Sequence, residues 1–368
     1  MFENEMAEQL EMAGVDMVIS LPCDKNKGFT DLIHERFPVV DITREEDGVG
    51  ISAGAYLMGK RPVISIQSSG IGNMMNAIMS LTACYHLPMV ILASWRGVDG
   101  ERIEAQIPFN SRIPGLLDCY GIGCTDLADP EDIPKVSGVI ERAFSGNSIE
   151  VVLIHPKLWG ESKRTITEYP VRRRHVKLSV DDESEPPTMT RLDAIRAIMA
   201  AVGEDDIVVS NIGVPSKEVH AARDRPLNFY MLGSYTQATP IGLGMAISTD
   251  RRVIVIDGDG SLLGSSIFPV LSAMDPENLT VICLDNGTFG STGNQINQAY
   301  LDVDMGEVAA AYGLDNVYTT DEPGKLSDLV RDAEGMSFIH VLIIPKNSDS
   351  PNLTFTAVEI RDRFMGAL

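Results

Sequence analysis

The sequence predicts an α/β protein of two domains, each built on a mostly parallel sheet that is covered by helices on both faces. Three observations lead to this fold class. Short apolar runs alternate with helix-like segments along most of the chain, which is typical of parallel strands connected by helices. The segment 161–190 interrupts the alternation with a basic stretch, an acidic stretch and paired prolines. The 368 residues suffice for two domains of ordinary size.

In the first half, each apolar run indicates a buried strand that ends in polar or small residues. The expected strands are 17–21, 39–42, 63–67, 89–93 and 151–155. Helices are expected at 2–12, 30–37, 48–58, 73–83 and 131–144. The polar segment 94–111 is expected to form a loop, and the first domain to occupy residues 1–165.

The second half repeats the alternation. Its apolar runs predict strands at 207–210, 229–232, 253–256, 279–284, 316–318 and 338–344. Helices are expected at about 190–198, 216–223, 236–247, 265–274, 305–312, 323–332 and 357–365. Thr188 or Thr190 could cap the first of these helices. We expect an exposed linker at 166–187 and a second domain at 188–368.

Composition narrows the class of protein. A net charge of −22 argues against nucleic acid or an anionic membrane surface as the main partner. No apolar run reaches membrane-spanning length, and the first residues lack the pattern of a signal peptide. The five cysteines are scattered without zinc-ligand spacing, which indicates free thiols in a reducing cytoplasm.

The segment 252–293 carries the clearest chemical pattern. One strand ends at Asp257-Gly258-Asp259-Gly260-Ser261, and the next ends at Asp285-Asn286, which places Asn286 27 positions after Asp259. The carboxyl ends of parallel strands meet at one sheet edge, where ligands bind. A carboxylate and an amide oxygen at that edge suit a hard divalent cation that holds phosphates.

Other interpretations of this segment remain open. A surface turn after a strand needs no function. The pattern is also close to the opening motif of haloacid-dehalogenase phosphatases, with Asp257 as nucleophile. Those enzymes need a later lysine and an acidic cluster, whereas only Lys325 and Lys346 follow and no paired acidic motif ends a strand. A calcium-binding EF-hand is excluded because Phe268 stands where the twelfth-position glutamate belongs.

The whole segment resembles the thiamine diphosphate motif, in which a Gly-Asp-Gly sequence precedes a pair of asparagines. By this resemblance Gly258, Asp259, Gly260 and Ser261 bind the cofactor. Asp259, Asn286 and the backbone carbonyl of Thr288 would hold Mg²⁺ on the diphosphate. Asp285 replaces the first asparagine, which is not usually the metal ligand.

A second motif lies in the first half. Thiamine enzymes of the pyruvate decarboxylase superfamily carry a glutamate nine positions before a glycine in a small-residue helix, and Glu45 precedes Gly54 by that spacing. The resemblance implies that Glu45 bonds to the aminopyrimidine ring and promotes removal of the thiazolium C2 proton. The alternative is a solvated acidic helix start, because Glu46 and Asp47 are adjacent.

Two further segments resemble family elements beside the cofactor. The segment Ser69–Asn73, which contains Gly70, resembles the family's SGxGxxN segment, which lies beside the cofactor. Gly233, Ser234 and Tyr235 are similar to the turn whose backbone grips the aminopyrimidine and whose third residue wedges under the cofactor. Tyr235 is bulkier than the usual wedge residue, and Thr236 replaces the usual glycine, which puts the geometry of the wedge in doubt.

The chain has no room for the middle domain of the larger family members. Two-domain chains of this order resemble the decarboxylases of sulfopyruvate and phosphonopyruvate. The resemblance rests on the stretches LPCDK (21–25), QSSGIGN (67–73), SWRG (94–97), YMLGS (230–234) and DNGTFGSTGNQ (285–295). It favours the sulfopyruvate branch, with alpha and beta subunit regions fused.

The resemblance implies an activity and an assembly. The expected reaction converts 3-sulfopyruvate to sulfoacetaldehyde and CO₂, a step of coenzyme M biosynthesis, with thiamine diphosphate and Mg²⁺ as cofactors. The small 2-oxo acid would be the partner molecule. The cofactor is expected between the first domain of one protomer and the second domain of another, so at least a homodimer is expected. A catalytically silent thiamine-binding scaffold or regulatory partner is a further alternative.

The residues that select the substrate are the least defined. A sulfonate needs local cations or N–H donors. Arg96, at a strand end, is the first candidate and Lys25 the next, although both could be ordinary surface residues. Asp24 could face the substrate or cap a helix. His86 could protonate the decarboxylated intermediate or be a buried structural histidine.

Overall fold

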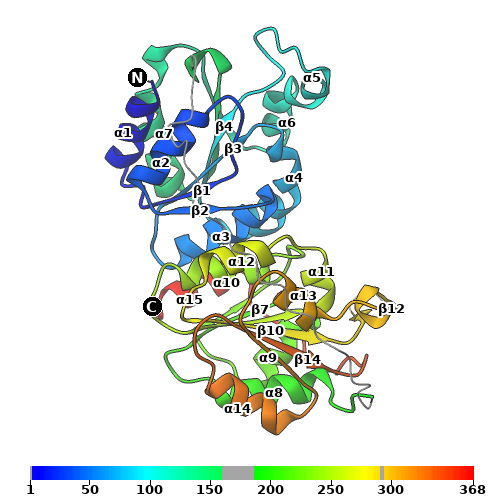
Figure 1. Cartoon of the computed structure of the whole chain (residues 1–368). Helices are drawn as coiled ribbons and strands as arrows, with labels where there is room; N and C mark the ends of the chain where they lie inside the picture. The colour runs from blue at the N-terminus through cyan, green and yellow to red at the C-terminus, as the bar shows by residue number, and fades with distance from the viewer. Residues whose placement is uncertain (1, 160–185, 291–293) are drawn as a thin grey trace. The chain divides into compact units, whose positions relative to one another are not determined.

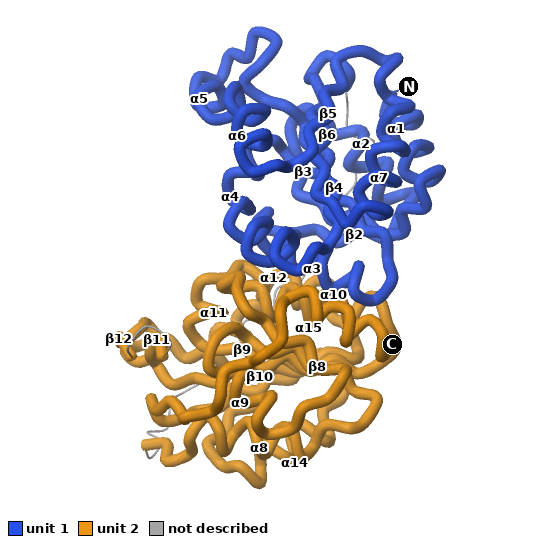
Figure 2. The backbone as a smooth tube through the Cα atoms, turned by 180° about the vertical axis from the view of Figure 1, so that it is seen from behind, with its two compact units in different colours: residues 1–172 blue, residues 173–368 orange. Residues whose placement is uncertain are grey.

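The computed structural model describes residues 2–159, 186–290 and 294–368, which form two compact units (Figures 1 and 2). Unit 1 is residues 1–172 and unit 2 is residues 173–368. Residues 166–185 of the predicted linker lie outside the described residues. In the described part of the chain, no helix is long and apolar enough to cross a membrane.

Unit 1 is built on a six-stranded parallel sheet in the order β2-β1-β3-β4-β6-β5. Its strands are β1 (Met17–Ser20), β2 (Val39–Asp41), β3 (Pro62–Gln67), β4 (Met89–Ser94), β5 (Gly123–Leu127) and β6 (Ile149–Ile154). Its helices are α1 (Phe2–Met12), α2 (Lys27–Arg36), α3 (Glu45–Leu57), α4 (Gly70–Ala77), α5 (Ile107–Asn110), α6 (Ile113–Cys119) and α7 (Lys135–Gly146). The π-helical segment η1 (Ile78–Ala83) continues α4.

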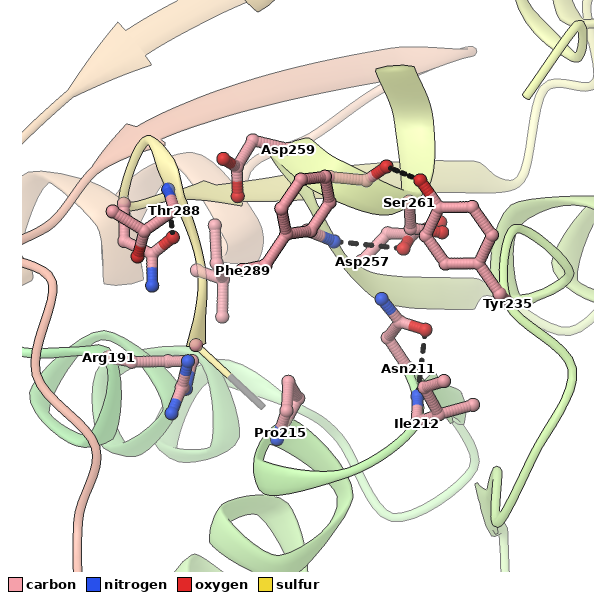
Figure 3. Close-up of a pocket in the computed structure, with 15 residues that line it drawn as sticks. Arg191, Asn211, Ile212, Pro215, Tyr235, Asp257, Asp259, Ser261, Thr288 and Phe289 are labelled. Carbon is pink, nitrogen blue, oxygen red and sulfur yellow. Dashed lines mark hydrogen bonds between the residues drawn. The ribbon is translucent and has the colours of Figure 1, made fainter. Parts of the chain in front are cut away.

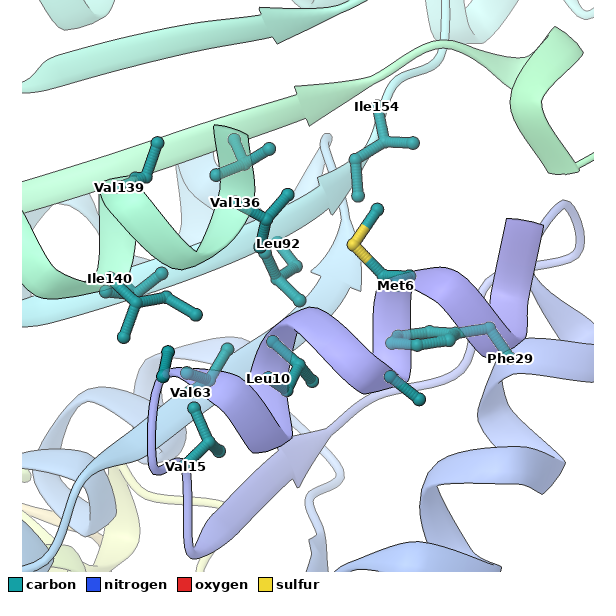
Figure 4. Close-up of a cluster of buried hydrophobic side chains, with 14 of the residues drawn as sticks. Met6, Leu10, Val15, Phe29, Val63, Leu92, Val136, Val139, Ile140 and Ile154 are labelled. Carbon is teal, nitrogen blue, oxygen red and sulfur yellow. The ribbon is translucent and has the colours of Figure 1, made fainter. Parts of the chain in front are cut away.

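The core of unit 1 joins α1, α2 and α7 to one face of the sheet (Figure 4). Leu10 of α1, Phe29 of α2 and Ile140 of α7 are fully buried against alternate strand residues such as Val63 and Leu92. The other face is covered by α3, where a Cβ on Gly48 would lie 3.0–3.9 Å from isoleucines of the sheet. Helices therefore cover both faces, which confirms the predicted fold class for this unit.

Unit 2 repeats the architecture in the order β13-β14-β10-β9-β7-β8, again with all pairs parallel. The strands are β7 (Ile207–Ser210), β8 (Asn228–Tyr230), β9 (Val253–Gly258), β10 (Leu279–Asp285), β13 (Asn316–Thr320) and β14 (Ser337–Leu342). The helices are α8 (Arg191–Ala201), α9 (Val214–Ala222), α10 (Ala238–Ala246), α11 (Asp259–Leu263), α12 (Phe268–Met274), α13 (Met305–Ala311), α14 (Pro323–Arg331) and α15 (Ala357–Met365).

Local sequence explains how the elements of unit 2 begin and pack. Thr190, one of the two expected caps, starts α8 because its hydroxyl accepts the Asp193 N–H at 3.2 Å. Gly242 lets α10 approach β9 closely, since a Cβ there would lie 2.1 Å from the side chain of Val255. The parallel pairing of β9 with β7 and β10 places the carboxyl ends of these three strands side by side at one sheet edge.

Several elements differ from the expected ones. The edge strand β5 and helix α6 were not predicted, because β5 alternates in burial and lacks an apolar run. A small antiparallel pair, β11 (Thr288–Phe289) with β12 (Gln295–Ile296), also escaped prediction. The expected helix 265–274 begins only at Phe268, and a separate short helix, α11, begins at Asp259 itself. That early start bears directly on the candidate site.

We expect Leu10→Ala to destabilise unit 1 by about 2–5 kcal/mol, because it opens a cavity in a fully buried cluster. The matched substitution Met12→Ala lies on the same helix at a side chain that is 74% exposed, and should change stability by less than about 0.5 kcal/mol. Both tryptophans, Trp95 and Trp159, belong to unit 1, so tryptophan fluorescence during denaturant unfolding measures this unit selectively. Equal effects of the two substitutions would contradict the described core.

Candidate active site

A pocket of ≈ 240 Å³ opens at the carboxyl ends of β7, β9 and β10 in unit 2 (Figure 3). Seven of the residues predicted to bind a cofactor line it: Tyr235, Gly258, Asp259, Gly260, Ser261, Asn286 and Thr288. Residues that were not predicted to bind a cofactor line it as well: Arg191, Asn211, Ile212, Pro215, Asp257, Leu284, Phe289 and Gly290. The pocket therefore gathers the central sequence pattern around one cavity.

Asp259 is the first residue of α11, and it is 3% exposed. One carboxylate oxygen accepts a hydrogen bond of 2.6 Å from the Asn297 side-chain amide. Burial raises the pKa of Asp259 to about 6, and the neighbouring charge of Asp285 adds to the rise. Burial removes the water that would stabilise the ionised carboxylate, and a bound cation would replace that stabilisation.

The segment after β10 curls back over this carboxylate. The Asn286 side-chain oxygen accepts the Thr288 N–H at 3.0 Å, and an Asp285 oxygen accepts the Gly287 N–H at 2.9 Å. Gly287 has φ +64, and a Cβ there would approach Tyr300 to 2.7 Å, so this turn requires glycine. The turn brings an amide side chain and a main-chain carbonyl to the pocket that holds Asp259.

This donor set has the chemistry of a hard cation site. It offers a carboxylate, an amide oxygen and a backbone carbonyl. Among the described residues no group of three or more His, Cys, Asp or Glu side chains could hold a metal ion, so a site built from acidic side chains alone is not present there. A cation held by Asp259, Asn286 and Thr288 would have coordination positions left for phosphate oxygens.

Other features of the pocket fit a bound polar group. The buried hydroxyl of the pocket-lining Ser261 lacks a hydrogen-bond partner, and so does that of Ser234, which precedes the pocket-lining Tyr235 in the chain. A Cβ on Gly260 would lie 2.8 Å from the Phe289 ring, so glycine keeps the backbone accessible at that point. Buried polar atoms without partners are rare in proteins, and they are explained here if a ligand supplies the missing bonds.

The turn Gly233–Thr236 is strained. Ser234 and Thr236 have φ +67 and φ +75, and such conformations cost roughly 1–3 kcal/mol each for residues other than glycine. Between them, the Tyr235 hydroxyl donates a hydrogen bond of 2.5 Å to the Gly260 carbonyl (Figure 3). The bulky residue at the wedge position is thus tied to the turn that carries Asp259.

In unit 1, Glu45 is the first residue of α3 and is half-buried. Its carboxylate accepts a hydrogen bond of 2.9 Å from the Asn73 side chain. Gly70 lies directly against it, because a Cβ there would stand 2.4 Å from the Glu45 Cγ. The adjacent Glu46 is instead paired with Arg44 at 3.0 Å. Glu45 and Gly70, predicted from separate motifs, thus meet, and Asn73 is the orienting residue that joins them.

Arg96 lies in a different setting from the one expected for an anion-binding residue. Its side chain is buried, and it donates to Glu101 at 2.7 Å and to Gln67 at 3.2 Å. The hydrogen bond from Arg96 lowers the pKa of Glu101 to about 2, so this pair is a buried ion pair. Asp24 pairs with Lys27 at 2.8 Å. Asp24, Lys25 and Arg96 all line a second, polar pocket of ≈ 340 Å³ together with Arg102.

His86 does not meet the other candidates. It is exposed, and it lies in the turn before β4, at the amino end of that strand. Glu45, Gln67 and Arg96 follow the carboxyl ends of β2, β3 and β4, at the opposite edge of the same parallel sheet. Its φ of +52 marks it as a turn residue. His86 therefore lies apart from the other unit 1 candidates, and its role as a proton donor stays a prediction that this placement does not support.

Two family models match the chain. The model described as thiamine pyrophosphate enzyme, N-terminal TPP binding domain, matches residues 2–111. The model described as thiamine pyrophosphate enzyme, C-terminal TPP binding domain, matches residues 212–341, which include Asp259 and Asn286. The chain thus has the two cofactor-binding domains of a thiamine diphosphate enzyme.

Individual relatives narrow the family. The sulfopyruvate decarboxylase of Methanosarcina acetivorans is 39% identical over 100% of this chain and 97% of the relative. The phosphonopyruvate decarboxylase of Streptomyces viridochromogenes is 32% identical, over 95% of this chain and 91% of the relative. The sulfopyruvate decarboxylase subunits beta and alpha of Methanocaldococcus jannaschii are 40% and 38% identical. They match 48% and 41% of this chain, and 96% and 91% of the respective subunit.

The chain belongs to the sulfopyruvate decarboxylase family of thiamine diphosphate enzymes. The fold agrees with a solved structure, the benzoylformate decarboxylase of Polynucleobacter necessarius. That structure has a TM-score of 0.69 at 12% identity, and the match covers 94% of this chain and 99% of the other. At that identity the likeness supports the fold alone.

We expect Gly70→Ala to displace the Glu45 carboxylate, because the new methyl group would overlap it. Folding stability should change little, since the half-buried Glu45 can move. Cofactor-dependent turnover should fall by about 10²-fold, the usual effect of misplacing a reacting group by about 1 Å. Gly138→Ala, in α7 with open space around its position, is the control and should retain full turnover. Unchanged turnover in Gly70→Ala would contradict the contact.

Proposed function

We propose that this chain decarboxylates 3-sulfopyruvate to sulfoacetaldehyde and CO₂, with thiamine diphosphate and Mg²⁺ as cofactors. The observation that carries the proposal is the 39% identity to a sulfopyruvate decarboxylase over the whole chain. The grouping of Asp259, Asn286 and Thr288 in one pocket, and of Glu45 with Gly70 and Asn73, supports it.

Unit 2 would hold the cofactor through its diphosphate. Asp259, Asn286 and the Thr288 carbonyl would bind Mg²⁺, and the unpartnered hydroxyls of Ser234 and Ser261 would complete the polar contacts. When bound, thiamine diphosphate supplies a carbon nucleophile and a sink for the electron pair that remains as CO₂ leaves. Arg191, the single cation among the pocket-lining residues that the structure describes, would face the phosphates.

Glu45 would hold and release the proton that the aminopyrimidine ring exchanges. The Asn73 amide keeps the Glu45 carboxylate in one orientation, and Gly70 leaves the space that this orientation needs. Glu46 is less suited to this role, because it is buried and its carboxylate is ion-paired with Arg44 at 3.0 Å. A carboxylate that is half-exposed and hydrogen-bonded on one side is suited to reversible proton transfer.

The assembly follows from where these groups reside. Glu45 belongs to unit 1 and the diphosphate pocket to unit 2, and related sulfopyruvate decarboxylases are named as alpha and beta subunits. We propose a homo-oligomer, at least a dimer, in which the cofactor is shared between the first unit of one copy and the second unit of another. The oligomeric state of the purified chain with and without cofactor, measured by sedimentation, tests this assembly.

The substrate sulfonate would bind in the polar pocket of unit 1. Lys25 and Arg96 line this pocket. Arg96 already donates to Glu101, so the pair is close to neutral and would offer the sulfonate oriented N–H donors rather than a positive charge. Lys25 is therefore the stronger candidate for charge neutralisation, with Arg102 beside it. Asp24 lines the same pocket, although its pairing with Lys27 fits a surface role equally well.

The alternative functions fare differently. Phosphonopyruvate decarboxylation is the second candidate function, because the phosphonopyruvate decarboxylase of Streptomyces viridochromogenes also aligns with 95% of this chain. A phosphatase with Asp257 as nucleophile is disfavoured: the side chain is fully buried, and its oxygens accept from Thr239 at 2.6 Å and from the Gly258 N–H at 2.8 Å. A silent thiamine-binding partner is disfavoured by the orientation of Glu45 against Asn73.

One assay separates these functions. The purified chain with thiamine diphosphate and Mg²⁺ receives sulfopyruvate, phosphonopyruvate or pyruvate, and CO₂ release is measured. We expect the highest kcat/KM for sulfopyruvate and loss of CO₂ release when the cofactor or Mg²⁺ is withheld. Higher kcat/KM for phosphonopyruvate would reassign the substrate, and no release from any of the three would refute the decarboxylase proposal.

Glu45→Gln should lower cofactor-dependent CO₂ release by at least about 10²-fold, because general acid–base groups contribute on that scale. The neighbouring Glu46→Gln is the matched control and should keep most of the activity, since Glu46 faces Arg44. Cofactor binding to both variants, measured by calorimetry, should stay within a few-fold of the parent. The reverse order of activities would assign the proton exchange to Glu46.

A further inference from the structure

One buried histidine contacts both ends of the segment that covers the diphosphate pocket. We call this segment the covering loop and define it by its described residues, Asp285–Gly290 and Asn294–Asp304. It carries Asn286 and Thr288 as well as Asn297, which bonds to Asp259. The His340 Nε2 lies 2.8 Å from an Asp285 carboxylate oxygen, and its Nδ1 lies 3.5 Å from an Asp304 oxygen.

The sheet register explains how one ring reaches both ends. His340 is in β14, which pairs with β10, where Cys283 lies opposite His340 and Asp285 is the last residue. Asp304, at the far end of the covering loop, caps α13 by accepting the Glu307 N–H at 2.8 Å. The covering loop therefore leaves the sheet and rejoins a helix within reach of a single side chain, which is 1% exposed.

The charges of the three groups are matched. Burial by itself would lower the pKa of His340, but the hydrogen bond to Asp285 and the nearby Asp304 carboxylate outweigh it and raise the pKa to about 9. The proximity of His340 lowers the pKa of Asp304 to about 2. The ring thus carries a positive charge at neutral pH, in contact with the residue that precedes the pocket-lining Asn286.

Asp285 makes this charge necessary. The related motif has asparagine at this position, so the Asp285 carboxylate adds a negative charge directly next to Asn286, which lines the pocket. A buried carboxylate next to a phosphate-binding site is unfavourable unless a cation is close to it. His340 is the cation that the structure places in contact with Asp285.

We propose that His340 is a positioning residue for the metal and diphosphate site, which holds both ends of the covering loop and offsets the charge of Asp285. The inference rests on the proposed use of Mg²⁺ and thiamine diphosphate, and it does not depend on which 2-oxo acid is the substrate. It assigns a role to a residue that no sequence motif singled out.

The test measures cofactor binding to the full chain without substrate. In His340→Gln, the amide can still donate to Asp285 but carries no charge. We expect the dissociation constant for Mg²⁺, titrated calorimetrically at fixed thiamine diphosphate, to rise by about 10–100-fold, as found for residues that orient metal ligands. The double variant His340→Gln/Asp285→Asn removes both charges, and should return to within a few-fold of the parent.

Controls separate positioning from general destabilisation. Val341→Ala, on the same strand and fully buried, should lower stability but leave the Mg²⁺ dissociation constant unchanged. If His340→Gln fails to fold, Asp304→Asn tests the same contact at its more exposed end and should weaken Mg²⁺ binding in the same direction.

Hydrogen exchange gives a second readout in the cofactor-free chain. In His340→Gln, the Gly287 and Thr288 amides should exchange faster than in the parent, because their hydrogen bonds depend on the position of Asp285 and Asn286. Unchanged Mg²⁺ affinity in the single variant, or no recovery in the double variant, would overturn the inference. A parent chain that binds no thiamine diphosphate would instead refute the cofactor site itself.

Discussion

A carboxylate buried at the edge of a parallel sheet sets the requirements for the rest of unit 2. Asp259 is held away from water, and its hydrogen-bond donors are neutral: the Asn297 amide and backbone N–H groups of Gly260 and Asn286. Neutral donors stabilise a buried charge only in part, which is why the pKa of Asp259 is raised. The fold places this group where three strand ends converge, in the pocket that we propose holds a cation and, through it, a phosphate group.

The cations near the two sites are themselves paired. Arg191 bonds to the fully buried Glu218 at 2.8 Å, Arg96 to Glu101, and His340 to Asp285. A buried cation without a partner would be available to bind an anion, even in a chain of net charge −22. The cations found here are already neutralised by carboxylates, so they mainly hold neighbouring side chains in position. In the proposed function, anion recognition in unit 2 therefore falls to the metal ion and to hydroxyl groups such as that of the pocket-lining Ser261.

The sequence predicted the position of a residue correctly where that position depends on the strand the residue follows. Apolar runs predicted the buried strands, and the strand ends predicted that Asp259 and Asn286 lie at one sheet edge. Glu45 and Gly70 were each assigned to the cofactor site by resemblance to the family, and their contact with one another was not predicted. Prediction failed where position depended on distant partners. Arg96 follows its strand as expected, yet its pairing with Glu101 depends on how the following loop folds back. His86 is close in sequence to β4 but lies at its amino end, opposite the edge that carries the other unit 1 candidates, and no sequence motif contains His340.

The strained turn at Ser234–Thr236 shows how a departure from the family pattern can be accommodated. Two residues that disfavour positive φ occupy a conformation that glycine would adopt freely, so other contacts must hold them. The Tyr235 hydroxyl supplies one by bonding to the Gly260 carbonyl, next to Asp259. An aliphatic residue at the wedge position has no hydroxyl and could not make this hydrogen bond. The bulky side chain therefore links the turn expected to contact the aminopyrimidine ring to the helix that begins at Asp259, the proposed metal ligand. The two bonded residues lie 25 positions apart in sequence.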